Sequence, residues 1–186
     1  MSNAVVQISR ALDYAARKHV SQRRKGEAQE PYINHLAEVA YLLAAATGGG
    51  DTNLIIAGLL HDCIEDQGVT HAELVALFSA DVADLVRDVT DDKTLLKAER
   101  KRLQVAHAPR KSDRAKMLKI ADKTSNLRAL AVSPPKGWDE QRIRDYYAWA
   151  QAVVAGCRGV NAFLEAKFDE ACTAPSPLAG EGRDGG

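Results

Sequence analysis

Imidazole and carboxylate side chains occur in this chain directly after a strongly apolar segment. His61, Asp62, Glu65 and Asp66 follow the run 54–60, which contains only Leu, Ile, Ala and Gly. Burying ionisable groups is costly unless they are paired or bound to a metal. A divalent ion compensates for burial of both kinds of side chain, because it neutralises carboxylates and binds an imidazole nitrogen as a ligand. The segment therefore predicts a metal site.

Two other segments each add one polar residue to a mostly apolar pattern. His35 lies at the start of a predicted helix, and Asp122 ends the stretch 117–122. Two His and two Asp side chains make a mixed N₂O₂ set with room for water and substrate, which suits Mn²⁺, Fe²⁺ or Zn²⁺ better than Ca²⁺. We therefore predict that His35, His61, Asp62 and Asp122 bind one ion. Asp122 alone could instead be a buried ion-pair partner of a nearby Lys or Arg.

Helical spacing of apolar residues predicts the elements that carry these side chains. Gly and Pro breaks and capping residues divide the chain into about eight helices. They are predicted at 5–20, 33–46, 51–67, from 70 onward, 81–89, 95–106, 112–132 and 139–171. On one helix over 51–67, His61 would lie beside Glu65 and Asp62 beside Asp66. Because no stretch alternates like a strand, the fold class is predicted as all-α, a bundle of about eight or more helices around one metal site.

Composition limits the possible partners. The chain has 186 residues with 25 Lys+Arg and 25 Asp+Glu, and this balance argues against binding nucleic acid or an anionic membrane. No apolar run approaches the roughly 20 residues of a membrane span. Three scattered cysteines without zinc spacing favour a reduced, cytoplasmic chain. We predict one domain over 1–172 and a disordered Pro/Gly-rich tail over 173–186, and the oligomeric state stays open.

Several motifs together resemble a known family. They are residues 18–25 (KHVSQRRK), 31–35 (PYINH), 60–66 (LHDCIED), 89–93 (VTDDK), 119–123 (KIADK), 126–128 (NLR) and 137–138 (GW). Their order resembles the hydrolase domain of the RelA/SpoT family. His35, His61-Asp62 and Asp122 match the H…HD…D pattern of HD-domain metal phosphohydrolases. Over about residues 8–168 the chain is most similar to the stand-alone small alarmone hydrolases of the metazoan SpoT-homologue type.

The resemblance implies an HD-domain helical bundle and a specific reaction. The substrate would be guanosine 3′,5′-bis(diphosphate), ppGpp, or its 5′-triphosphate form pppGpp. Hydrolysis at the 3′-pyrophosphate would give GDP or GTP and pyrophosphate, with one Mn²⁺ per chain. Spacing alone leaves Fe²⁺ and Zn²⁺ open. No alarmone synthetase domain is recognised, which implies a hydrolase-only enzyme. The chain departs from the family pattern at Leu36, at Gln67-Gly68 and at Ala129, and none of these is a predicted ligand.

The resemblance also implies roles for other residues. Glu65 and Asp66 would orient or deprotonate the attacking water, or protonate the leaving ribose oxygen; otherwise they are a solvated helix end. Arg24 could stack on the base and Lys25 could bind phosphate, although a solvated basic loop explains either one singly. The full set of predicted substrate-binding residues is Arg24, Lys25, Lys97, Asn126, Arg142 and Tyr146.

Two alternative functions stay open from the sequence. A site built for a phosphorylated ribose could remove the 2′-phosphate of NADPH. A sensor could bind the alarmone without cleaving it. The intact pair Glu65-Asp66 favours catalysis over sensing, because a sensor has no need of two carboxylates beside the metal.

Overall fold

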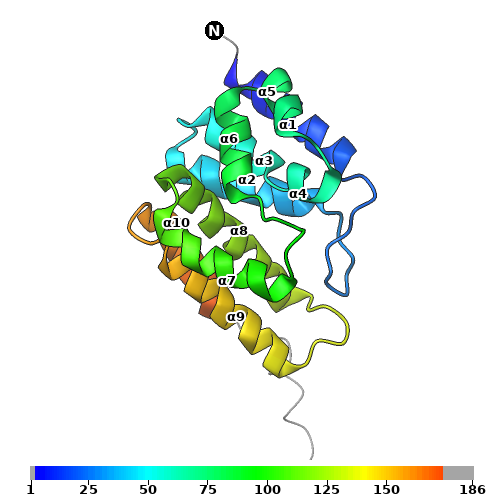
Figure 1. Cartoon of the computed structure of the whole chain (residues 1–186), viewed down its shortest axis with the longest axis vertical. Coiled ribbons are helices and arrows are strands. Elements are labelled where there is room, and N and C mark those ends of the chain that lie inside the picture. The colour runs from blue at the N-terminus through cyan, green and yellow to red at the C-terminus, as the bar shows by residue number, and fades with distance from the viewer. Residues whose placement is uncertain (1–2, 174–186) are drawn as a thin grey trace, which may run out of the picture.

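The chain is all-helical, as predicted. In the computed structural model, which describes residues 3–173, the helices follow one another with short connections (Figure 1). Their bounds are α1 Ala4–Lys18, α2 Ile33–Thr47, α3 Thr52–Leu60, α4 Cys63–Gln67, α5 His71–Leu77, α6 Ala80–Val89, α7 Lys97–His107, the 3₁₀ turn η1 Ala108–Arg110, α8 Asp113–Val132, α9 Glu140–Ala155 and α10 Ala162–Thr173. Across these residues no strand forms, and only isolated bridges link Arg23 to Pro31 and Gly26 to Pro135.

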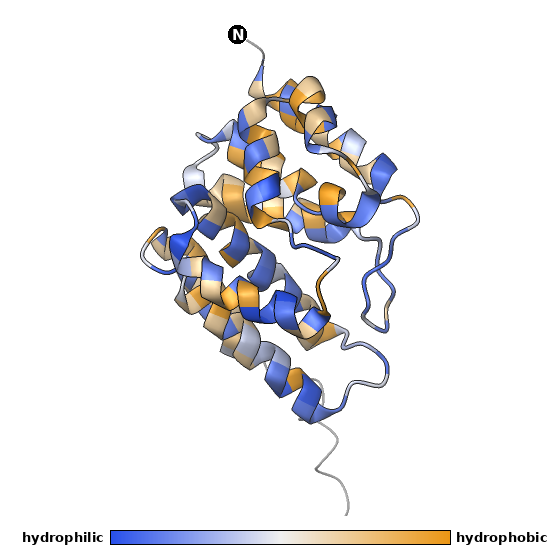
Figure 2. Cartoon of the chain, in the orientation of Figure 1, coloured by the Kyte–Doolittle hydropathy of each residue, from blue (hydrophilic) through white to orange (hydrophobic). Residues whose placement is uncertain are grey.

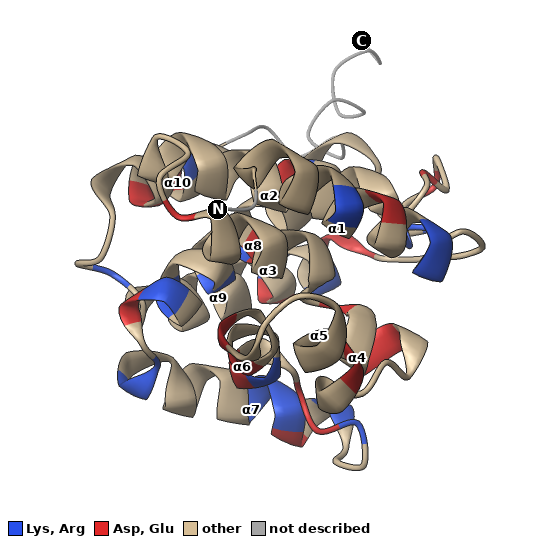
Figure 3. Ribbon diagram, turned by 90° about the horizontal axis from the view of Figure 1, so that it is seen from above, with Lys and Arg blue, Asp and Glu red and all other residues tan. Residues whose placement is uncertain are grey.

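Helix α3 lies at the centre of one half of the molecule. Every residue from Leu54 to Leu60 is buried, and α3 packs against α1, α2 and α6. Helix α8 is the centre of the other half and packs against α9 and α10, while its contact with α2 joins the halves. Hydrophobic positions gather where helices meet, and the connection between α1 and α2 is hydrophilic (Figure 2). Charges of both signs are interspersed around the molecule (Figure 3), in keeping with the zero net charge.

A glycine allows α2 and α3 to approach closely. A Cβ atom at Gly58 would lie 2.8 Å from Leu43 Cδ1 and 3.3 Å from the Ala40 Cα. Only a residue without a side chain fits this crossing. The close approach brings the start of α2, with His35, next to the end of α3, with His61.

The predicted helix over 51–67 is wrong in its middle, because two helices form there. Helix α3 ends at Leu60, and α4 begins at Cys63. The His61 ring nitrogen Nδ1 contacts the Gly58 carbonyl oxygen at 2.8 Å. The ring thereby pairs with the Gly58 carbonyl in the last turn of α3. In a continuing helix, a backbone amide would have donated to this carbonyl instead. The metal-site dipeptide consequently lies in a turn instead of on a helix face.

The predicted helix over 139–171 is also wrong, since α9 and α10 are separate. Gly159 has a left-handed backbone (φ 92°) in the connection. The Asn161 side chain then accepts a hydrogen bond from the Leu164 amide at 3.0 Å and caps α10. Both residue types are typical break signals. The predicted tail begins at Thr173, which instead ends α10, and the rest of that prediction lies outside the described residues.

The structure also bears on membrane association. Among residues 3–173, no helix is both long enough and apolar enough to cross a bilayer.

Candidate metal centre and nucleotide cavity

Four polar side chains converge at the junction of α2, α3, α4 and α8. His35 Nε2 lies 3.4 Å from Asp122 Oδ1 and 3.8 Å from Asp62 Oδ2. His61 Nε2 lies 3.2 Å from Asp62 Oδ2 and 3.9 Å from Asp122 Oδ1. His35, His61 and Asp62 form a candidate metal site, and Asp122 closes it from α8. The structure therefore brings together all four residues that the sequence singled out.

The second nitrogen of each imidazole is held by the protein. His35 Nδ1 contacts Ser125 Oγ at 2.9 Å, and His61 Nδ1 contacts the Gly58 carbonyl at 2.8 Å. The Ser125 hydroxyl donates to Glu38 Oε2 at 2.6 Å, so Ser125 Oγ is the acceptor for His35 Nδ1–H. Both rings then present the Nε2 lone pair to the centre, as metal-binding histidines do.

One buried atom in the centre has no partner. His61 Nε2 makes no hydrogen bond within residues 3–173, although Asp62 Oδ2 is only 3.2 Å away. A buried polar atom without a partner is destabilising and calls for an explanation. A cation between the two imidazoles and the two carboxylates supplies the missing partner. The donor set and this orphaned nitrogen fit a divalent metal.

The charge state of the side chains agrees with such a site. Burial lowers the pKa of His35, which favours its neutral, ligating form. Burial also disfavours charge on His61, but the Asp62 and Asp122 carboxylates and the Gly58 carbonyl together outweigh it and raise the pKa of His61 to about 9. A proton on His61 and a metal ion at the centre are therefore alternative ways to compensate the carboxylates. Metal binding would displace this proton, because only neutral imidazole coordinates.

Neighbouring side chains hold the two aspartates. The Tyr32 hydroxyl donates to Asp62 Oδ2 at 2.6 Å. Asp122 accepts from the Asn126 amide at 2.6 Å and from the Lys123 ammonium at 2.9 Å. Burial opposes ionisation of Asp122, yet Lys123, with further contributions from His35 and His61, more than offsets it and holds the pKa of Asp122 well below its usual value. Asp122 is therefore a fixed negative charge whose orientation is set from two sides.

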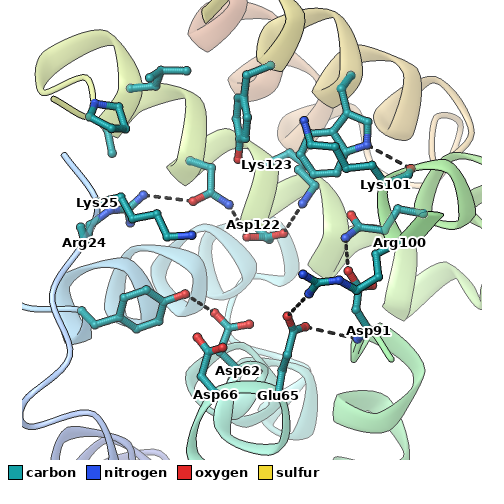
Figure 4. A pocket seen from close by; sticks show the side chains of 18 of the residues that line it. Arg24, Lys25, Asp62, Glu65, Asp66, Asp91, Arg100, Lys101, Asp122 and Lys123 are labelled. Atoms are coloured by element: carbon teal, nitrogen blue, oxygen red, sulfur yellow. Dashed lines mark hydrogen bonds and ion pairs between the residues drawn. The ribbon is translucent and has the colours of Figure 1, made fainter. Parts of the chain in front are cut away.

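Glu65 and Asp66 project from α4 toward the same centre (Figure 4). The Asp91 amide donates to Glu65 at 3.2 Å, and the Arg100 guanidinium lies 3.6 Å from it. Asp66 pairs with Lys93 and accepts from Gln22. Burial and the nearby Asp62 raise the pKa of Glu65, so this carboxyl group holds a proton more readily than an ordinary glutamate.

The centre opens into a cavity of about 600 Å³, a volume typical of small-molecule sites. Arg24 and Lys25 come from the α1–α2 connection on one side, and Arg100 and Lys101 come from α7 on the opposite side (Figure 4). All six predicted substrate-binding residues line the cavity: Arg24, Lys25, Lys97, Asn126, Arg142 and Tyr146. The carboxylate floor with cationic walls can hold a metal and an anionic ligand together.

Comparison with known proteins agrees with this geometry. Residues 11–150 match the HD domain family. The chain belongs to the HD domain family. The guanosine-3′,5′-bis(diphosphate) 3′-pyrophosphohydrolase MESH1 of Xenopus tropicalis is 49% identical, over 91% of this chain and 94% of that protein. Human MESH1 is 48% identical, over 89% and 92%.

Solved structures show a similar fold. One, from work on a metazoan ortholog of SpoT that hydrolyzes ppGpp, superposes with a TM-score of 0.85 at 46% identity and covers 89% of this chain and 93% of its own. A Listeria monocytogenes protein superposes with a TM-score of 0.64 at 29% identity, over 77% and 96%. The resemblance seen in the sequence and the predicted HD-domain fold are confirmed.

Several residues of this HD-domain cavity were missed by sequence reasoning. Those not predicted as site residues include Gln22, Tyr32, Asp91, Lys93, Arg100, Lys101, Lys123, Trp138 and Trp149. Some lie inside the recognised motifs, as Tyr32 and Lys93 do, and this was an available signal. Both tryptophans line the cavity beside Tyr146. Nothing in the local pattern around Arg100 or Lys101 distinguishes them from a solvated helix face.

Proposed function

We propose that this HD-domain chain hydrolyses ppGpp and pppGpp at the 3′ position and releases pyrophosphate. The observation that carries the proposal is the orphaned His61 nitrogen among two carboxylates and a second imidazole, at the floor of a cavity with cationic walls. The relatives named above, about 48% identical over most of the chain, bear the name of this activity.

The resident metal proposed is one Mn²⁺ held by His35, His61, Asp62 and Asp122. When bound, it would polarise a phosphoryl oxygen and make water more acidic. Two imidazoles and two carboxylates leave positions open for ligands other than protein, as in catalytic metal sites. Fe²⁺ and Zn²⁺ satisfy the same donor set, so metal analysis belongs in the test below.

Glu65 and Asp66 are proposed to move protons. The oxygen of water forms a bond to the phosphorus nearest the ribose, and the bond from this phosphorus to the 3′ oxygen breaks. One carboxylate takes a proton from the water, and the ribose oxygen receives a proton as it leaves. The raised pKa of Glu65 suits it to hold a proton in one part of this cycle. Lys93 on Asp66 and Arg100 near Glu65 orient the pair.

The nucleoside is proposed to lie on the α1–α2 side of the cavity. Arg24 donates to Asn126 Oδ1 at 3.1 Å, and its guanidinium plane could stack on a base. Lys25, Lys97, Arg142 and Tyr146 surround the remaining space and would contact phosphate or ribose oxygens. These contacts stay proposals.

Two broader predictions accompany the activity. Residues 1–172 are proposed to act as one domain. All three cysteines, Cys63, Cys157 and Cys172, are free, which supports a reducing compartment such as the cytoplasm.

Turnover and metal content together test this function. Purified protein loaded with Mn²⁺ should release pyrophosphate from ppGpp, and NADPH should be assayed in parallel. His61→Ala should lose both turnover and bound metal. The matched control is His71→Ala. His71 lies on α5, outside the cavity, where its half-exposed side chain contacts Asp84 of α6. No pyrophosphate from the wild type, or strong selectivity for NADPH, would refute the proposal.

A further inference from the structure

Lys101 on α7 differs from three cations of the active centre that have carboxylate partners. Lys123 pairs with Asp122, Lys93 with Asp66, and Arg100 lies near Glu65. Within residues 3–173, no carboxylate oxygen lies within 4.0 Å of the Lys101 ammonium. These internal pairs account for three of the cations. Lys101, like Lys25, Lys97 and Arg142 of the same cavity, has no carboxylate partner within that distance.

Aromatic rings hold Lys101 in place. Its ammonium lies 4.5 Å from the centroid of the Trp149 ring and 5.3 Å from that of Tyr146. The Trp149 indole in turn donates to the Lys101 carbonyl oxygen at 3.1 Å. Cation–π contacts stabilise an ammonium without neutralising its charge. Lys101 is therefore positioned before any ligand arrives, and its charge stays available.

The surroundings of Lys101 favour an anion. Burial and the nearby ammonium groups of Lys97 and Lys123 lower the pKa of Lys101, and Arg142 acts in the same direction. The Asp145 carboxylate opposes this effect. Half-buried cations that repel one another are stabilised when an anion with several negative oxygens binds between them.

Lys101 is linked to the metal centre by a short chain of contacts. Lys123 donates to Asp122 and also lies 4.5 Å from the Trp149 centroid, at the same ring as Lys101. Arg24 and Lys25 are on the opposite side of the centre (Figure 4). A phosphate chain that begins at the centre and extends away from Arg24 would therefore extend toward the side where Lys101 lies (Figure 4).

We propose that Lys101, held on Trp149, binds the outer phosphate of the 3′-diphosphate and so selects a diphosphate over a monophosphate ester. This inference rests on the proposed function for its substrate. It assigns the α7 wall to the pyrophosphoryl end and leaves the nucleoside to the Arg24 side. The recognised group is a terminal phosphoryl group, and inorganic pyrophosphate presents the same group without a nucleoside.

The test compares Lys101→Met with Arg102→Met in Mn²⁺-loaded full-length protein. Methionine keeps an apolar stem over Trp149 and removes the charge. Arg102 is the next residue on α7, is exposed, pairs with Glu99 and does not line the cavity. Calorimetry measures binding of inorganic pyrophosphate and of guanosine 5′-diphosphate 3′-monophosphate. Chelation of the metal by pyrophosphate affects both variants equally, so their ratio isolates the contribution of Lys101.

Lys101→Met should weaken pyrophosphate binding about 10- to 100-fold relative to Arg102→Met, as expected for loss of a charge-assisted hydrogen bond. Binding of the 3′-monophosphate should change less than about threefold, and Lys101→Arg should restore most of the pyrophosphate affinity. Equal pyrophosphate binding by the two variants, or equal losses for both ligands, would overturn the proposal. Undetectable pyrophosphate binding by the wild type would also overturn it.

These outcomes are separable from failure of the proposed function. Pyrophosphate binding requires no turnover, so a protein that leaves ppGpp intact can still show or lack the Lys101 effect. If ppGpp is hydrolysed, kcat/KM for ppGpp should fall by the same factor as pyrophosphate affinity in Lys101→Met.

Discussion

Removal of the Ser125 hydroxyl should weaken metal binding without directly changing a metal ligand. Ser125 Oγ lies 2.9 Å from His35 Nδ1, and both side chains are buried. In Ser125→Ala, this ring N–H loses its acceptor, and a buried donor without a partner costs about 1–3 kcal/mol. The ring would also be free to rotate away from the centre. Loss of such an outer partner typically lowers metal affinity about 10- to 100-fold.

Two measurements check this prediction. Competition with a chelator gives the Mn²⁺ dissociation constant directly. Thermal or urea unfolding with and without Mn²⁺ also reports the dissociation constant, because metal that binds only the folded chain raises the free energy of unfolding. A 100-fold weaker site loses up to about 2.7 kcal/mol of this stabilisation at saturating metal. Glu38→Gln should have a smaller effect, since Glu38 holds Ser125 and contacts His35 only through it.

The neighbouring residue provides the control. The Thr124 hydroxyl donates to the Ile120 carbonyl at 2.8 Å on the same helix and is fully buried. Thr124→Ala should lower the free energy of unfolding and leave the Mn²⁺ affinity unchanged. If Ser125→Ala behaves in the same way, with metal affinity within about threefold of wild type, the reasoning about His35 is refuted.

Three further perturbations follow from the structure. Glu65→Gln should lower kcat for ppGpp by about 10²- to 10⁴-fold while metal content, measured by elemental analysis, stays at the wild-type value; retained turnover would exclude a proton-transfer role. Gly58→Ala should lower the free energy of unfolding in urea by about 1–3 kcal/mol, because its Cβ would lie 2.8 Å from Leu43 Cδ1; an unchanged midpoint would contradict the close helix crossing. The Arg114 guanidinium hydrogen-bonds Asp81 and holds the pKa of Asp81 below its ordinary value of 3.8. The pair therefore stabilises the fold above pH 3.8. This contribution is lost as the pH falls through the lower pKa that Asp81 has in the folded state. The Tm difference between wild type and Arg114→Ala should therefore shrink on acidification below 3.8, and a constant difference would count against the pair.

The local sequence was sufficient for most of the helices. Apolar spacing, the glycines after α2 and the prolines after α8 mark boundaries that the structure keeps to within a few residues. Prediction from local sequence failed where a side-chain contact replaces a backbone hydrogen bond of the helix. The His61 imidazole hydrogen-bonds the Gly58 carbonyl. No local pattern shows that a side chain will compete with a backbone amide for this acceptor. The break at Gly159 and Asn161 did carry local signals, and the continuous-helix interpretation passed over them.

The sequence by itself determined which residue types could form a metal centre. Histidine and aspartate on apolar helices are costly to bury singly, so His35, His61, Asp62 and Asp122 could be grouped from chemistry alone. Their roles as ligands, and those of Glu65 and Asp66 in catalysis, stay predictions. Their proximity follows from the packing of α2, α3 and α8, which their apolar faces bring together.

Only the tertiary structure decided which cations are already paired. Lys93, Lys123 and Lys101 have the same side chain, and nothing in their spacing separates them. In the folded chain Lys93 and Lys123 pair with carboxylates, whereas Lys101 lies on the ring of Trp149, which is 48 residues away in the sequence. The strength and availability of a charge depend on distances to partners remote in the chain and on local burial. These distances and this burial are set only when the helices pack.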